Sequence, residues 1–390
     1  MLQTLFLCTL FLYPFIGVDH TLYLIPQLLL VGIGLAQLPQ FAAPTSSVMK
    51  VAVCGLAIVA GSIPILRELL ADQSEYLEPI KLSINLATVL LFLFLVPVFD
   101  PLVCAKWLKR FAIIWLLIVV YAYLHTDTST WQLLLMLIGP EGITSAHLYE
   151  IAEPLAPIFL TKNIMAMYVV AIFGVFLYFR QRAGERVTLI DKSLFFLLIV
   201  ALFSRQGILS GILLVAINSL VMRRGPSVRR WAVIVMIVTV LIVGIFFAFA
   251  FNLNSQEDGA TTRLELWRLF FSNWNRYVFE GLGVHQLNAS LEHLSIDNYH
   301  MFFMNQIAAY GLIHCLAFNS LLLVISLWCA PRRIRWFLIA PYWLNVCFQT
   351  YGYEYGNLLL YCIAANSCNL LPSPTPRYQE LVLKPLVKTA

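Results

Sequence analysis

The stretch around which this chain is organised reads TTRLELWRLFFSNWNRYVFEGLGVHQLNASLEHLSIDNYHMFFMNQIAAYGLI (residues 261–313) and lies between two long apolar runs. It concentrates ionisable side chains in a chain that has few of them: Arg263, Glu265, Arg268, Arg276, Glu280, His285, His293, Asp297 and His300. It also contains the pair Gly281-x-Gly283. Because glycine lets backbone N–H groups approach a ligand closely, we expect a binding or catalytic site in this stretch.

The rest of the chain is strongly apolar. It is 61% hydrophobic and only 12% charged, about half the charged fraction of a typical soluble domain. Apolar runs of about 20 residues recur from end to end. The composition therefore predicts an all-α polytopic integral membrane protein. We expect one transmembrane helical domain over residues 1–371 and a Pro-rich tail over 372–390.

The apolar runs predict about 12 transmembrane helices. Their expected ranges are about 2–18, 21–37, 48–66, 82–99, 110–125, 159–179, 193–204, 206–222, 231–251, 300–329, 336–350 and 357–371.

The basic residues set the expected orientation. With both termini in the cytoplasm, the inner loops hold all but seven of the 25 basic residues, as the positive-inside rule requires. The seven on the outer side are Arg67, Lys81, Lys162, Arg205, Arg263, Arg268 and Arg276. We expect these to bind an anionic group or to pair with a neighbouring acid.

The outer loop over 252–300, between helices 9 and 10, is expected to contain an amphipathic helix. Its apolar positions recur at spacings of three and four: Leu264, Trp267, Phe271, Trp274 and Val278. This pattern is typical of a helix lying along the membrane surface. The alternative is a packing helix with a Glu265–Arg268 pair.

The sequence lacks the motifs that identify several classes of enzyme. There is no Walker loop, H-E-x-x-H, loop D-x-D or G-x-S-x-G, and the outer histidines and acids are not at metal-ligand spacing. The eight cysteines form no C-x-x-C pair and mostly lie in apolar runs, so we expect them to pack as small hydrophobes. We expect no metal, no cofactor and no nucleic-acid partner.

Two arginines are candidates for binding a phosphate group. Arg205 lies in FSRQG, where two short apolar runs meet, and Arg263 begins the amphipathic segment. An Arg fork matches phosphate oxygens, and two of them suit a diphosphate leaving group. The alternatives are a snorkelling side chain for Arg205 and a salt bridge to Glu257, Asp258 or Glu265 for Arg263.

The other candidates are weaker on pattern alone. His300 opens the tenth run, for which Asp297 and Asn298 are candidate N-caps, and is either a base for an acceptor hydroxyl or a structural residue. Gly311 is expected to let this long run bend. The remaining candidates for substrate binding are Lys162 (alternatively an interface anchor), Arg268, Arg276, Gly281 and Gly283.

Four segments resemble the O-antigen ligase and polymerase superfamily of membrane glycosyltransferases. They are TKNIMA (Lys162, Asn163), FSRQG (Ser204, Arg205, Gly207), TTRLELW with GLG (Arg263, Trp267, Gly281, Gly283) and NYHMFFMNQIAAYGLI (His300, Gly311). The resemblance covers roughly residues 159–330. In that superfamily Asn usually follows the His, whereas Met301 follows His300 here, and Asn298 is a candidate substitute.

The resemblance implies a bacterial inner-membrane enzyme with its site and large loop facing the periplasm. The donor would be an undecaprenyl-diphosphate-linked glycan, transferred with inversion and without a metal. Arg205 and Arg263 would hold the diphosphate, and His300 would serve as base or orient the acceptor. The acceptor would be lipid A–core for a ligase or a second lipid-linked glycan for a polymerase, and we favour the ligase.

Two other classes fit the composition. A transporter or flippase of lipid-linked glycan would need paired repeats and ionisable groups near the middle of the membrane. A non-catalytic scaffold would tolerate alanine at Arg205, Arg263 and His300. The polar residues of this chain concentrate at the expected outer boundary instead, which favours an enzyme.

Overall fold

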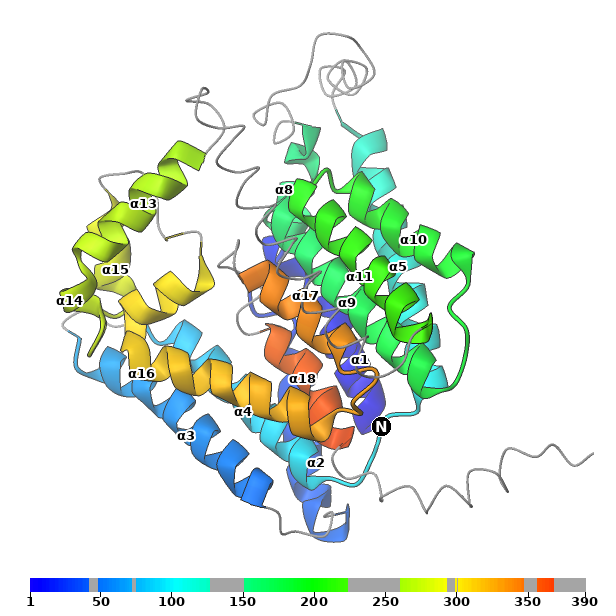
Figure 1. Ribbon diagram of the computed structural model, residues 1–390, viewed down its shortest axis with the longest axis horizontal. Helices are drawn as coiled ribbons and strands as arrows, with labels where there is room; N and C mark the ends of the chain where they lie inside the picture. Colours follow the sequence, from blue (N-terminus) through cyan, green and yellow to red (C-terminus); the bar gives the residue numbers. More distant parts are fainter. Residues whose placement is uncertain are drawn as a thin grey trace, which may run out of the picture.

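The computed structural model describes residues 1–41, 48–71, 75–126, 151–223, 260–292, 299, 301–346 and 356–367 (Figure 1). These residues are mainly helical and include no β-strand. Among them, four helices are long and apolar enough to cross a membrane. They are α3 (Val48–Leu69), α4 (Leu77–Phe94), α9 (Lys162–Arg182) and the run Phe302–Cys329, formed by α16 (Phe302–Val324) and a π-helical turn, η4 (Ile325–Cys329). The prediction of an all-α membrane protein is confirmed at this level.

The bundle also contains other helices. They are α1 (Leu2–Leu12), η1 (Phe15–Gly17), α2 (Leu24–Phe41), α5 (Pro101–Leu124), η2 (Glu153–Leu155), α8 (Ala156–Phe159), α10 (Leu189–Ala201), α11 (Arg205–Arg223), α17 (Trp336–Val346) and α18 (Gly356–Ser367). The predicted span 231–251 and the tail 372–390 lie outside the described residues.

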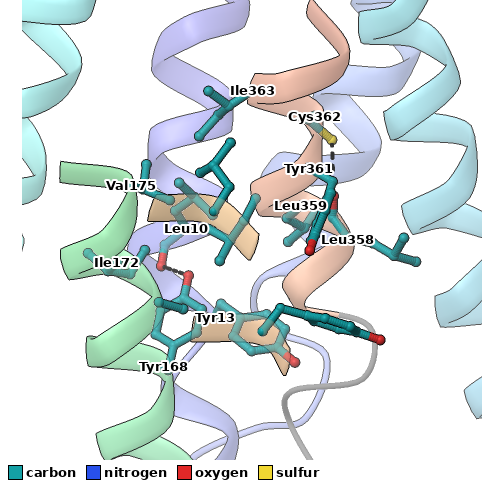
Figure 2. Close-up of a cluster of buried hydrophobic side chains, with 14 of the residues drawn as sticks. Leu10, Tyr13, Tyr168, Ile172, Val175, Leu358, Leu359, Tyr361, Cys362 and Ile363 are labelled. Carbon is teal, nitrogen blue, oxygen red and sulfur yellow. Dashed lines mark hydrogen bonds between the residues drawn. The ribbon is translucent and has the colours of Figure 1, made fainter. Parts of the chain in front are cut away.

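Helix α9 forms the centre of the bundle. Every residue from Ile164 to Phe179 is buried, as expected for a helix that is apolar on all sides. Figure 2 shows α9 beside α1 and α18, with the Tyr168 hydroxyl donating to the Leu10 carbonyl oxygen over 2.7 Å. The ring of Tyr13 lies 4.9 Å from that of Tyr168, centroid to centroid. These contacts bury the two tyrosines without leaving either ring against water.

Basic residues predicted on the cytoplasmic side gather at one end of the bundle. Lys109 Nζ lies 2.7 Å from Asp191 Oδ1, which joins α5 to α10. Arg182 Nη1 donates to Ser367 Oγ over 3.0 Å, which joins α9 to α18. Arg180 Nη2 also lies 3.8 Å from Asp191 Oδ2, so the end of α9 lies beside the start of α10.

Two helices begin earlier than the apolar runs predict. α4 begins at Leu77 because Glu78 and Lys81 pair over 2.9 Å within its first turns. α5 begins at Pro101 because Asp100 caps it, accepting from the backbone nitrogens of Leu102 and Val103. In both cases charged residues interrupt the apolar run in the sequence, but the helix extends through them.

The predicted amphipathic helix is broken. α13 (Ala260–Ser272) ends before Asn273, and α14 (Trp274–Tyr277) follows as a single turn. The side chains that pack inside the protein are Leu266, Phe270 and Tyr277, whereas Phe271 of the predicted apolar face is 62% exposed. The helix predicted over 264–278 is therefore interrupted at Asn273, and of its predicted apolar face Trp267 and Trp274 pack against the cluster whereas Phe271 does not.

The six described cysteines are free thiols, and Cys104, Cys315, Cys329 and Cys362 are buried as predicted. Cys347 and Cys368 lie outside the described residues.

Candidate functional site

Helix α16 is broken at Gly311. This glycine has φ 85° and ψ 168°, which lies outside the helical region. The break turns the Leu312 N–H away from the helix, and it donates instead to the Val278 carbonyl oxygen over 2.9 Å. The expected bend at Gly311 is confirmed, and it leaves carbonyl groups before the break in need of new partners.

The Gly281-x-Gly283 turn supplies those partners. The Leu282 N–H donates to the Ala308 carbonyl over 2.8 Å, and the Gly283 N–H donates to the Ala309 carbonyl over 2.9 Å. A β-carbon on Gly281 would lie 2.5 Å or less from the backbone of Ala309 and Tyr310, so only glycine fits. The turn and the broken helix therefore form one backbone-paired unit.

This pairing corrects the expectation that Gly281 and Gly283 contact a ligand through their N–H groups. The Gly281 N–H donates to the Tyr277 carbonyl over 3.1 Å, and the Val284 N–H donates to Glu68 Oε1 over 2.9 Å. All four N–H groups of residues 281–284 thus have protein partners. Gly281 is needed for close packing on α16, whereas Gly283 has φ 80° and lies against the Glu68 carboxylate.

Two neighbouring residues of α3 hold the turn from the other side. Arg67 Nε donates to the Gly281 carbonyl over 3.1 Å, and Arg67 Nη2 donates to the Leu282 carbonyl over 3.0 Å. Glu68 is fully buried and accepts from Val284 and from the Glu75 N–H, the latter over 3.0 Å. Arg67, predicted to bind an anion or pair with an acid, instead binds backbone carbonyl oxygens.

Tyr299 joins this unit to α13 and α14. Its hydroxyl lies 2.8 Å from that of Tyr277, and its ring packs edge-on against Phe270 with centroids 5.4 Å apart. Its backbone N–H donates to Asn305 Oδ1 over 2.8 Å. Burial, together with the hydrogen bond to Tyr277, raises the pKa of Tyr299 well above its ordinary value of 10.0. The residue before His300 is therefore fixed, while His300 itself lies outside the described residues.

The position of Arg263 follows from the helix period. Its backbone belongs to α13, one turn before Leu266 and Trp267, which pack in the same cluster as Tyr299. The side chains of Arg263 and Arg205 lie outside what the structure describes.

A second group of predicted residues meets at the starts of α9 and α11. Ser204 Oγ donates to Asn163 Oδ1 over 2.9 Å, which joins the FSRQG and TKN segments directly. Each start follows a non-glycine residue with positive φ, Leu160 at 64° and Phe203 at 49°. Such strained residues persist only where the surrounding structure holds them, and they often mark functional sites. Lys162 is buried beside this junction.

The contacts that link the two groups run through α17. Phe303, at the start of α16, stacks on Trp343 of α17 with centroids 5.9 Å apart. α17 in turn packs against α9 and α11, the helices that begin at Lys162 and Arg205. One helix thus separates the residues after position 300 from the helices that carry the second group.

Arg268 and Arg276 lie on the exposed side of α13 and α14. In the described part of the chain neither forms a salt bridge, so the alternative Glu265–Arg268 pair is not formed. The described residues also contain no group of three His, Cys, Asp or Glu side chains that could hold a metal ion.

Sequence patterns missed Glu68, Asn305 and the Tyr277–Tyr299 pair, and they predicted the wrong kind of partner for Arg67. Each acts through a partner that no local period reveals: Arg67 is 214 residues from Gly281. The one available signal was the adjacency of Arg67 and Glu68 at the end of an otherwise apolar run.

No protein-family model matches this sequence, and no curated protein is significantly similar to it.

Proposed function

We propose that this chain is a membrane glycosyltransferase of the O-antigen ligase kind. It would span a bacterial inner membrane about 12 times, with both termini in the cytoplasm and its site facing the periplasm. It would move a glycan from undecaprenyl diphosphate to lipid A–core. The proposal extends the four-segment resemblance given above.

One observation supports the proposal most. The residues that flank position 300 pack in two directions, Tyr299 against the cluster of α13 and Phe303 against Trp343 of α17. α13 carries position 263, and α17 packs on α11, which begins at position 205. Contacts of the described neighbours Tyr299 and Phe303 thus lead to α13 on one side and to α17 and α11 on the other, which supports a shared site for His300 and the two candidate arginines.

The roles follow from the chemistry of the side chains. The bond between the anomeric carbon and the diphosphate oxygen breaks, and its electron pair leaves with undecaprenyl diphosphate. Arg205 and Arg263 would stabilise the charge that develops there. The acceptor hydroxyl attacks from the opposite face of the sugar, and its proton passes to the His300 imidazole.

Lys162 would add positive charge beside Arg205, because it is buried at the start of α9 next to Asn163, the partner of Ser204. Arg268 and Arg276 would contact the carrier or membrane lipid phosphates from the exposed side of α13 and α14.

Two alternatives remain as proposals. A polymerase would use the same leaving group but join two lipid-linked glycans. A transporter of lipid-linked glycan is favoured by one feature, the break in α16, because transporters often build substrate sites at broken helices. In a transporter, however, the arginines would not be needed for glycosyl transfer on the outer face.

A lipopolysaccharide gel from a deletion strain, together with an assay of which membrane face holds the lipid-linked glycan, separates these functions. A ligase predicts core without attached glycan, with lipid-linked glycan retained on the periplasmic face. A polymerase predicts core with one repeat unit, and a transporter predicts lipid-linked glycan retained on the cytoplasmic face.

Complementation then tests the residues. Arg263→Ala, Arg205→Ala and His300→Ala should fail to restore glycan attachment at normal protein levels. Arg332→Ala, an exposed arginine after η4, is the matched control and should restore it. Full restoration by all three site variants would refute the proposal.

A further inference from the structure

We propose that Arg67 and Glu68 are positioning residues that hold the Gly281–Val284 turn on the break in α16 and so fix the part of α16 that runs from Phe302 to the break. This inference deepens the proposed function and rests on it for its link to glycosyl transfer. The hold on the turn itself stands on the contacts alone.

Arg67 acts on the carbonyl side of the turn. Its Nε and Nη2 atoms donate to two consecutive carbonyl oxygens, those of Gly281 and Leu282. The N–H groups of the same planar fork are fixed relative to each other, so they set the direction of both peptide groups together. A lysine ammonium lacks this fork and would constrain the pair less.

Glu68 acts on the N–H side. Gly283 precedes α15 (Val284–Leu291) and has no side chain to cap it, and the Glu68 carboxylate accepts from the first helical N–H at 2.9 Å. A carboxylate at this end also interacts favourably with the helix dipole. Since Glu68 also accepts from the Glu75 N–H, it ties the turn to the α3–α4 connection as well.

The Gly281–Val284 turn then pairs with the broken part of α16. With Arg67 and Glu68 in place, the Leu282 and Gly283 N–H groups point at the Ala308 and Ala309 carbonyls. A hydrogen bond between the buried Gln306 and His314 side chains also spans the break. The hold from α3 therefore acts, through the turn, on the part of α16 that runs from Phe302 to the break. Loss of Arg67 or Glu68 would free the turn and leave two buried carbonyls without partners.

Hydrogen exchange on the full-length protein in detergent tests the hold without reference to any activity. In Arg67→Ala and in Glu68→Gln, we expect amide exchange in peptides covering 278–284 and 299–312 to rise by about tenfold, the effect of losing one or two buried hydrogen bonds. Peptides from α9 should exchange as in the wild type, which excludes global unfolding. Arg67→Lys should give an intermediate increase.

Glu78→Gln is the matched control. Glu78 lies in the first turn of α4 and pairs with Lys81 rather than with the Gly281–Val284 turn. This variant should leave exchange in 278–284 unchanged. Wild-type exchange in Arg67→Ala and Glu68→Gln, or an equal rise in Glu78→Gln, would overturn the proposed hold.

Glycosyl transfer from undecaprenyl-diphosphate-linked glycan tests the link to catalysis. We expect kcat to fall about tenfold in Arg67→Ala with KM for the donor nearly unchanged, and partial recovery in Arg67→Lys. Faster exchange together with wild-type kcat would overturn the positioning role. If the wild type itself transfers no glycan, the proposed function fails, while the exchange result still decides whether Arg67 and Glu68 hold the turn.

Discussion

The hydroxyl groups of Tyr277 and Tyr299 lie 2.8 Å apart inside an aromatic cluster, and both side chains are at most 2% exposed. Phe270 of α13 packs against both rings. This one hydrogen bond connects the turn after α13 to the residue that precedes His300. Tyr299, the residue before His300, thereby packs in the same cluster as the helix that carries Arg263.

Replacing either tyrosine by phenylalanine should destabilise the protein. Each single change leaves the other hydroxyl buried without its partner, which costs about 1–3 kcal/mol. The double variant Tyr277→Phe/Tyr299→Phe removes both hydroxyls and should cost less than the sum of the singles. Thermal unfolding of the full-length protein in detergent measures this, and strictly additive losses would contradict the contact.

Gly281→Ala and Gly311→Ala should be among the most damaging small substitutions. Both positions have positive φ, and a β-carbon at Gly311 would lie 2.5 Å from the Phe279 carbonyl oxygen. We expect each substitution to lower the free energy of unfolding by more than about 3 kcal/mol, because backbone strain and a backbone clash both contribute.

Gly184→Ala is the control for this pair. Gly184 also has positive φ, but nothing lies within 4 Å of a β-carbon there. The Gly184→Ala variant should lose only about 1 kcal/mol of unfolding free energy, the cost of placing alanine in the left-handed region. Similar melting temperatures for all three variants would show that the turn does not approach α16 as closely as described.

Stability should depend on pH through Glu75. Burial, with the nearby charges of Glu78 and Glu68, raises the pKa of Glu75 above its ordinary value of 4.5. The folded protein then binds this proton more tightly than the unfolded chain does. Stability therefore falls as pH rises from about 4.5 through the raised folded pKa.

Glu75→Gln should remove that fall. The variant should melt at a higher temperature than the wild type at about pH 7.5, with the difference vanishing at about pH 4. Glu265→Gln, an exposed glutamate on α13, should give no such crossover. A wild type that is stabilised relative to Glu75→Gln at neutral pH would reverse the sign and contradict the assignment.

The Ser204–Asn163 hydrogen bond should couple the two junctions that carry Arg205 and Lys162. Ser204 is 1% exposed, so Ser204→Ala should cost about 1–2 kcal/mol, and a double-mutant cycle with Asn163→Ala should give a coupling of about 1 kcal/mol. Ser219→Ala, whose hydroxyl bonds only to a carbonyl of its own helix, is the control. A coupling of zero would mean that the two junctions are independent.

Much of the helical architecture could be predicted from apolar run length alone. The runs at 48–66 and 159–179 correspond to α3 and α9, and the break at Gly311 was expected from a glycine inside a long run. Helix starts at Leu77 and Pro101 were missed because an ion pair and a capping aspartate let helices extend past charged residues.

The pairing of the turn with the broken helix could not be predicted in this way. A sequence period indicates which side chains share a face, but it does not reveal which backbone groups meet across a turn. The Gly281-x-Gly283 pattern fits a ligand-binding turn and a close-packed turn equally well. Only the positions of Ala308 and Ala309, and of Arg67 and Glu68 far earlier in the chain, decide between them.

The most direct test of the account is glycosyl transfer by the purified full-length protein. Undecaprenyl-diphosphate-linked glycan and lipid A–core would be supplied, and glycan attachment to the core measured over time. We predict transfer by the wild type and by Arg332→Ala, and a loss of about 100-fold or more in Arg205→Ala, Arg263→Ala and His300→Ala. Transfer at the wild-type rate by these three variants, or none by the wild type, would contradict the account.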